Sequence, residues 1–112
     1  MSVVAVSEYI ALSGKSAYGR WFDQLDARAA ARVASAVYRL SEGNFSNTKG
    51  VGAGVFETRI DFGPGYRVYF GKDGELVVIL LGGSAKKDQR RAIEQAKTAW
   101  TEFKSRKRSG DL

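Results

Sequence analysis

The 112-residue sequence contains no cysteine and no histidine. The absence of cysteine excludes disulfides, thiolate nucleophiles and zinc sites with cysteine ligands. The absence of histidine excludes imidazole metal ligands and a Ser-His-Asp triad. Long apolar runs are also missing: the longest, Leu76 to Leu81, is far shorter than a membrane span, and Met1 to Leu12 lacks the pattern of a signal peptide. We therefore expect a soluble, cytoplasmic protein without membrane contacts.

The residues that are present suit one globular domain over residues 1–112. Hydrophobic residues make up 44% and aromatic residues 12% of the chain, which is enough to bury a core. The net charge of +6 is unevenly distributed: residues 86–108 hold nine Lys or Arg and three acids, and the remainder holds nine of each. Such asymmetry indicates a nucleic acid or an acidic protein as partner. The alternative is a solvated helix with a frayed tail. We expect the domain to end in a basic C-terminal tail at about 104–112.

The N-terminal half predicts a strand, two helices and a loop. Val3 to Ile10 is β-branched and apolar, which is typical of a strand. Ser16, or a neighbouring serine, can cap a first helix and Asp26 a second, which Gly43 ends. The polar face of the second helix is a basic ridge, for which an ordinary solvated face is the alternative; its members are Arg28, Arg32, Ser35 and Arg39. Residues 44–54 are polar and glycine-rich and predict a loop.

The C-terminal half predicts three strands and a helix. Alternation predicts strands over residues 55–62 and 66–70, joined by Gly63-Pro64-Gly65, and the continuous apolar run 76–81 predicts a central strand. Ser84 can cap the last helix, whose buried stripe is Ile93, Ala96, Trp100 and Phe103. The chain order βααβββα indicates an α+β fold, with a mainly antiparallel, twisted sheet packed against helices.

Side-chain parity predicts which residues leave the core face of the sheet. A three-residue turn at 63–65 places Ile60 opposite Val68 and Asp61 opposite Arg67. The residues that then project away from the aromatic core are Glu57, Arg59, Asp61, Arg67 and Tyr69. Cations with an exposed tyrosine suit a phosphodiester, because guanidinium grips phosphate and aromatic rings stack on unpaired bases. The alternative is that the two arginines pair with the two acids across strands.

One stretch of sequence resembles a known family. Its motifs are Gly54-Val55-Phe56-Glu57-Thr58-Arg59-Ile60, then Phe62-Gly63-Pro64-Gly65-Tyr66-Arg67-Val68-Tyr69-Phe70, then Leu80-Leu81-Gly82-Gly83 before Lys86-Lys87-Asp88-Gln89. These resemble the RelE/ParE toxin superfamily, and within it the HigB-like addiction module killer group. Similar residues at Trp21 to Leu25, Asn44-Phe45 and Ala92 to Trp100 extend the likeness over nearly the whole chain. The resemblance therefore implies a RelE-like fold.

The resemblance also implies a function. A toxin of this kind belongs to a type II toxin–antitoxin pair, with an antitoxin that is often a helix-turn-helix protein and DNA binding only as the complex. Many members are mRNA interferases, in which a 2′-hydroxyl attacks the adjacent phosphate, usually on the ribosome. Arg67 matches the arginine that contacts the reacting phosphate, and Arg59 and Lys49 match basic positions. Lys86 or Lys87 matches the basic residue after the last strand, and with Arg90 and Tyr69 they complete the expected RNA contacts.

The catalytic base is the main departure from the family pattern. Ribosome-dependent relatives often carry a late tyrosine or histidine, whereas the last tyrosine here is Tyr69. Glu57 or a lysine with a lowered pKa could take that role. We expect no cofactor or metal, since fixed cations can stabilise charge on the phosphate oxygens. A ParE-like gyrase poison and a non-catalytic antitoxin- or nucleic-acid-binding domain remain as alternatives, and the sequence leaves codon preference and oligomeric state open.

Overall fold

The computed structural model describes residues 3–112. In chain order its elements are β1 (Ala5–Glu8), α1 (Ala17–Asp23), α2 (Ala27–Ser41), β2 (Thr48–Gly52), β3 (Val55–Ile60), β4 (Tyr66–Lys72), β5 (Val77–Ala85), the 3-10 turn η1 (Lys86–Asp88) and α3 (Gln89–Arg108). None of the helices in this described part is long and apolar enough to cross a membrane.

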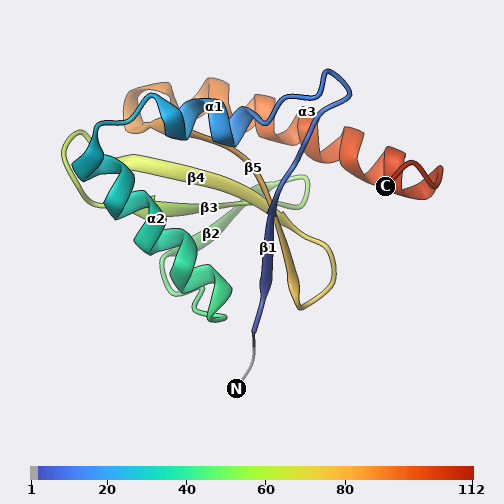
Figure 1. Ribbon diagram of the computed structural model, residues 1–112, viewed down its shortest axis with the longest axis horizontal. Coiled ribbons are helices and arrows are strands. Elements are labelled where there is room, and N and C mark those ends of the chain that lie inside the picture. The colour runs from blue at the N-terminus through green and yellow to red at the C-terminus, as the bar shows by residue number, and fades with distance from the viewer. Residues whose placement is uncertain (1–2) are drawn as a thin grey trace.

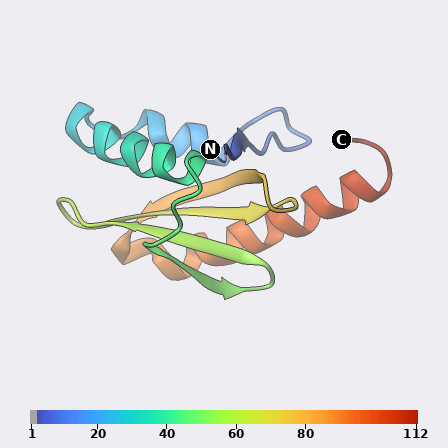
Figure 2. The same cartoon turned by 90° about the horizontal axis from the view of Figure 1, so that it is seen from below.

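The five strands form one mixed sheet in the order β1-β5-β4-β3-β2. β1 runs parallel to β5, and the other neighbours are antiparallel. Helices α1 and α2 cover one face of the sheet and α3 covers the other (Figures 1 and 2). The α+β prediction is confirmed at this level. Each face has its own core, because alternate side chains of the central strands point to opposite helical layers.

The prediction of a loop over residues 44–54 is wrong, because β2 lies within it. β2 pairs antiparallel with β3, and its register shifts between Gly50 and Gly52. The hairpin connection uses positive φ at Gly52, Ala53 and Gly54. Two glycines in five residues give β2 little strand propensity of its own, so its pairing with β3 supplies the order that the local sequence lacks. The chain order is therefore βααββββα.

The expected register of the β3–β4 hairpin is also wrong, although the expected faces are right. Ile60 lies opposite Tyr66 and Arg59 lies opposite Arg67, so the connection spans residues 61–65. The Gly65 N–H donates to the Phe62 carbonyl at 2.9 Å and closes this wider turn. Loops of three and of five residues preserve the same parity. Alternation therefore predicts which face of the sheet each residue occupies. It does not distinguish between cross-strand partners that are two residues apart.

Two of the three predicted helix caps are confirmed. The Ser16 hydroxyl accepts the Gly19 N–H at 2.9 Å, and the Asp26 carboxylate accepts the Ala29 N–H at 2.8 Å. Ser84 does not cap α3, because β5 continues to Ala85 and η1 comes before the helix. The Ser84 side chain is buried on the sheet instead. The apolar stripe of α3 is confirmed, with Ala96, Trp100 and Phe103 buried.

The C-terminal basic residues form helix for most of their length, not a tail. Residues 104–108 are the last turn of α3. Arg106 donates to the Tyr9 hydroxyl at 3.1 Å and to the Ile10 carbonyl at 2.9 Å, and Lys107 pairs with Asp73. These contacts tie the end of α3 to the region after β1 and to the β4–β5 turn. Only residues 109–112 extend past the helix.

Burial of Tyr18 on α1 gives the stability of the fold a pH dependence. Loss of hydration, with a smaller effect of Glu8, raises the pKa of Tyr18 from 10.0 to about 12. The unfolded chain therefore loses this proton first, so the free energy of unfolding should fall as the pH rises from about 10 to 12. Chemical denaturation at several alkaline pH values measures this, and Tyr18→Phe should make the fall less steep. Tyr38→Phe, at an exposed tyrosine, should follow the wild-type curve; equal slopes for both variants would contradict the assignment.

Candidate functional site

Two rows of polar residues cross the sheet on the face that α3 covers in part. One row places Arg59 opposite Arg67, and Arg67 opposite Ser84. The neighbouring row runs Lys49, Glu57, Tyr69 and Gly82. Like charges directly opposite one another destabilise a sheet. The Arg59–Arg67 pair is therefore an arrangement that the fold alone does not favour.

A cleft of about 380 Å³ opens where the first row meets the β3–β4 turn. Its walls are formed by the side chains and backbone of Arg59, Asp61, Phe62, Gly63, Pro64, Gly65, Arg67 and Lys86. Lys86 is brought there by its backbone, because its N–H donates to the Gly65 carbonyl at 3.0 Å. Three cations thus line the cleft against the single carboxylate of Asp61. We call this hollow the cationic cleft.

Arg67 is the most constrained cation of the cationic cleft. Its side chain is only 8% exposed, and its Nε has no hydrogen-bond acceptor within the described residues. The nearest carboxylate oxygen, Glu57 Oε1, lies 3.7 Å from Nε, and Nη1 makes a long contact of 3.3 Å to the Tyr66 carbonyl. A buried donor without an acceptor is costly. Because Arg67 lines the cleft, an anion there would add a charged acceptor for the guanidinium group.

Glu57 lies behind the cleft and not in it. Its side chain is fully buried and accepts two hydrogen bonds from Gln89 Nε2, at 2.8 and 3.1 Å. Lys49 Nζ, on an exposed side chain, is 3.7 Å from the same carboxylate. Glu57 is thus surrounded by one amide and two cations. Gln89 has no predicted role, and its only signal in the sequence is its place at the end of the Lys86-Lys87-Asp88-Gln89 motif.

Tyr69 is fully buried, so the expectation of an exposed tyrosine is wrong. It belongs to the core under α3. Its hydroxyl and that of Ser84 are 3.0 Å apart and share a hydrogen bond. Burial raises the pKa of Tyr69 above its ordinary value of 10.0, so the phenol stays neutral near pH 7. Tyr69 can therefore neither stack on a nucleobase nor act as the general base that takes the proton of a 2′-hydroxyl. The strand alternation was right, but α3 covers this position.

The other predicted residues separate into near and distant groups. Arg59, Arg67 and Lys86 meet in the cationic cleft. Lys87 and Arg90 are exposed on η1 and the first turn of α3 and do not line it. Figures 1 and 2 both place the end of α3, with its three terminal cations, at the opposite end of the molecule from the β3–β4 turn. The three cations that end α3 are therefore remote from the cleft.

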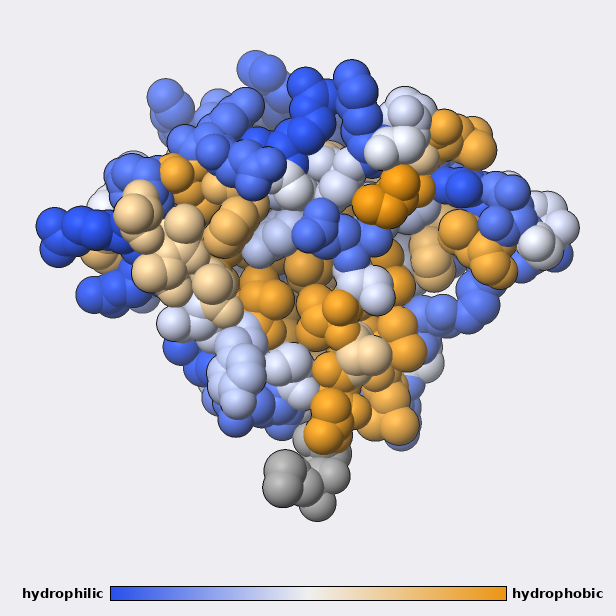
Figure 3. Space-filling model, in the orientation of Figure 1, coloured by the Kyte–Doolittle hydropathy of each residue, from blue (hydrophilic) through white to orange (hydrophobic). Residues whose placement is uncertain are grey.

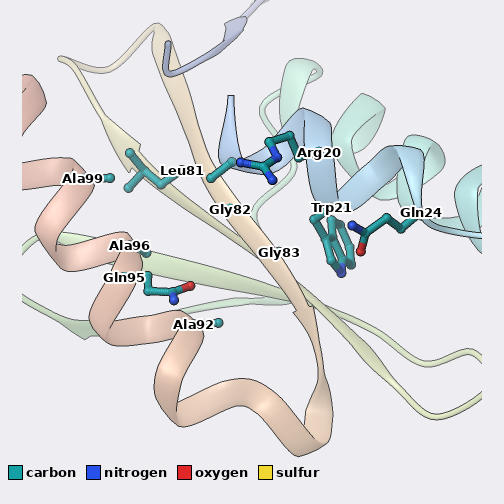
Figure 4. Close-up of a pocket in the computed structure, with 11 residues that line it drawn as sticks. Arg20, Trp21, Gln24, Leu81, Gly82, Gly83, Ala92, Gln95, Ala96 and Ala99 are labelled. Carbon is teal, nitrogen blue, oxygen red and sulfur yellow. The ribbon is translucent and has the colours of Figure 1, made fainter. Parts of the chain in front are cut away.

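A second hollow lies at the edge of β5 beyond its pairing with β1. Figure 4 shows its floor at Leu81, Gly82 and Gly83, with α1 on one side and α3 on the other. Alanines of α3 form much of its wall, and Arg20 is the only charged side chain among its lining residues. A β-carbon at Gly82 would contact nothing within 4 Å. This groove can accept a chain segment, but it lacks the charge needed to hold a phosphodiester.

Apolar side chains also reach the surface beside β1. Figure 3 shows an apolar area over the lower half of the face on which β1 lies. A shallow hollow there is lined by Val6, Tyr18, Phe22, Val37 and Leu80, among others. Tyr38 and Leu76 are 65% and 58% exposed. Exposed apolar surface next to an unpaired strand edge is typical of a protein contact.

Comparison with known proteins identifies one relative and no family model. No protein-family model matches the chain. The chain is 43% identical over 81 residues to an uncharacterized protein of Haemophilus influenzae, strain Rd. The match covers 71% of this chain and 82% of that protein.

Proposed function

The chain belongs to the same family as the Haemophilus influenzae protein, and we propose that it is a metal-independent endoribonuclease that acts at the cationic cleft. One observation carries the proposal: Arg59 and Arg67 are held directly opposite each other beside Lys86. Among the described residues Arg59 forms no ion pair, and Arg67 has only the distant Glu57. Three cations at one hollow with little internal neutralisation fit the charge of a phosphodiester.

The proposed reaction is attack by an RNA 2′-hydroxyl on the adjacent phosphorus. A bond forms between that oxygen and phosphorus, and the bond to the 5′-oxygen of the next nucleotide breaks. The products are a 2′,3′-cyclic phosphate and a 5′-hydroxyl: a base takes the proton of the 2′-hydroxyl, and the leaving 5′-oxygen gains one from solvent, so the reaction balances without a metal. Arg67 and Arg59 stabilise the charge that grows on the non-bridging oxygens. Lys86 holds the leaving side of the strand by charge.

The general base must be a group that reaches the cleft. Glu57 does not meet this condition, because it is fully buried and occupied by Gln89. Asp61 is the carboxylate among the lining residues. We propose that Asp61 accepts the proton of the attacking hydroxyl. Glu57, held by Gln89, positions Arg67 and Lys49. A base needs reach as well as a suitable pKa.

The toxin role is part of the same proposal. The motifs from residue 54 to 89 that resemble the RelE/ParE superfamily support it, since they include Arg59, Arg67 and Lys86. A toxin needs an antitoxin, here expected to be of the helix-turn-helix kind. The groove at Gly82 and the apolar surface beside β1 are two surfaces outside the cleft that could receive it. DNA binding is expected only for the complex of the two proteins, and the ribosome is the expected place of cleavage.

The test is to add the purified protein to a translation extract and to map the ends of the RNA. We expect fragments that a polynucleotide kinase labels without prior phosphatase treatment, because their 5′ ends are hydroxyls. Fragments with 5′-phosphates would contradict the proposed chemistry. A parallel assay with gyrase and supercoiled plasmid tests the gyrase-poison alternative. Cleaved plasmid with intact messenger RNA would refute the endoribonuclease proposal in favour of a gyrase poison. No effect in either assay would refute both functions.

A further inference from the structure

Two arginines of α2 lie over one aromatic ring at the rim of the cationic cleft. The Cζ of Arg32 is 4.8 Å from the centroid of the Phe62 ring, and that of Arg28 is 6.0 Å away. Phe62 belongs to the β3–β4 turn and lines the cleft. Figures 1 and 2 show the start of α2 and this turn at the same end of the molecule. Phe62 therefore connects the basic ridge of α2 to the cleft, because it lines the cleft and contacts two arginines of the ridge.

The fold by itself gives little reason for two arginines here. Both side chains are exposed, and within residues 3–112 neither forms an ion pair. Like charges four residues apart on a helix destabilise it. An exposed cation–π contact stabilises the pair in turn, but one arginine is enough to make it. The second arginine adds repulsion over a ring that the first arginine already covers, and this favours an anionic ligand close to both.

The geometry also prepares these groups to bind phosphate. A guanidinium over an aromatic ring has fewer orientations available, and its N–H donors can still reach an oxyanion. The turn residues between Phe62 and the deeper part of the cleft are Gly63, Pro64 and Gly65, which carry no charge and little bulk. A strand of nucleic acid could therefore pass over the turn from Arg59 and Arg67 in the cleft to Arg28 and Arg32 on α2. Arg39, two turns along α2, is exposed but has no ring beneath it.

We propose that Arg28 and Arg32 form a second phosphate-binding site, which holds the backbone of the single-stranded RNA that continues out of the cationic cleft. This inference rests on the proposed function, because it assigns the path of the same substrate. It also predicts that affinity depends on RNA length. A fragment confined to the cleft touches only Arg59, Arg67 and Lys86. A longer strand gains two further phosphate contacts on α2.

The experiment measures binding of 2′-O-methyl RNA, which cannot be cleaved because it lacks the attacking hydroxyl. Fluorescence anisotropy of a labelled trinucleotide and a labelled oligonucleotide of about 12 residues is recorded over a range of salt concentrations. The Arg28→Ala/Arg32→Ala variant should bind the longer RNA more weakly. Its slope of log K against log salt should fall by about 1.4, since each phosphate contact on a single strand contributes about 0.7. Binding of the trinucleotide should not change.

Two further variants test whether the position of the arginines, and not only the positive charge of α2, determines RNA binding. Arg39→Ala removes a cation from the same helix and should leave the slope for both RNAs unchanged. Phe62→Leu keeps both arginines but removes the ring that orients them. It should weaken binding of the longer RNA by about 2- to 5-fold, which corresponds to the cation–π free energy, with the slope nearly preserved.

The outcomes distinguish this inference from the function on which it rests. If both RNAs bind and Arg67→Lys weakens them, while Arg28→Ala/Arg32→Ala behaves like wild type, the second site is wrong and the cleft stands. A loss of affinity in Arg39→Ala as large as in the double variant would also overturn it, since the effect would be unspecific. If neither RNA binds the wild-type protein, both the cleft as an RNA site and its extension fail.

Discussion

Replacing Arg67 with lysine is expected to lower the rate of RNA cleavage by about 10²- to 10³-fold, the usual cost of losing one placed donor to a transition-state oxyanion. Lysine keeps the charge but loses the planar pair of donors that matches a phosphate. The Arg67 side chain is only 8% exposed, so a lysine in its place has little room to approach the phosphate differently. Single-turnover cleavage of a defined messenger RNA bound to ribosomes measures the effect.

A matched control separates catalysis from folding in this experiment. Arg39→Lys makes the same chemical change at an exposed arginine of α2 and should leave the cleavage rate as it is. Chemical denaturation of both variants shows how much stability is lost. A slow Arg67→Lys enzyme that is still folded supports a direct contact with the phosphate. Cleavage at the wild-type rate would remove Arg67 from the mechanism and with it the main support for the cationic cleft.

Replacing Gly83 with alanine is expected to lower the free energy of unfolding by about 1–3 kcal/mol, the range for adding a methyl group to a filled space. A β-carbon at this position would lie 2.1–2.5 Å from three ring atoms of Trp21. The ring is held by Tyr18 and Tyr66, with centroids at 6.1 and 6.2 Å. The clash can be relieved only by moving α1 or by withdrawing the indole from the core. Denaturant titration and thermal unfolding both report the change.

The adjacent glycine is the control for this prediction. Gly82→Ala adds the same methyl group to the same strand, but nothing lies within 4 Å of the new β-carbon. Its stability should stay within about 0.5 kcal/mol of wild type, as is usual for substitutions away from a filled core. Equal losses in the two variants would show that backbone freedom, and not the packing of Trp21, accounts for the effect.

Much of the fold follows from patterns that are local in the chain. The caps at Ser16 and Asp26 were predictable because each serves backbone N–H groups only a few residues away. Alternation placed Arg59 and Arg67 on one face, because period 2 is a property of a single strand. β2 was missed for the same reason. Its Lys-Gly-Val-Gly segment carries no local signal and is ordered only by pairing with β3.

The candidate site was predictable in its residue types and not in its arrangement. Arg59, Arg67 and Lys86 could be named from the motifs, but the five-residue turn that sets the two arginines opposite each other could not. The burial of Glu57 and Tyr69 could not be predicted either, because it depends on where α3 lies across the sheet. Gln89 and Phe62 gain their contacts from elements more than 20 residues away in the chain.

The sequence by itself determined the chemistry that this protein can use, the sidedness of its strands and most of its helix starts. The absence of cysteine and histidine leaves cations, carboxylates, amides and hydroxyls for any site. The tertiary structure decided which of these groups meet. Capping and alternation act between neighbours in the chain, whereas the cationic cleft depends on strand register and on the placement of helices on each face, which only packing of distant segments can set.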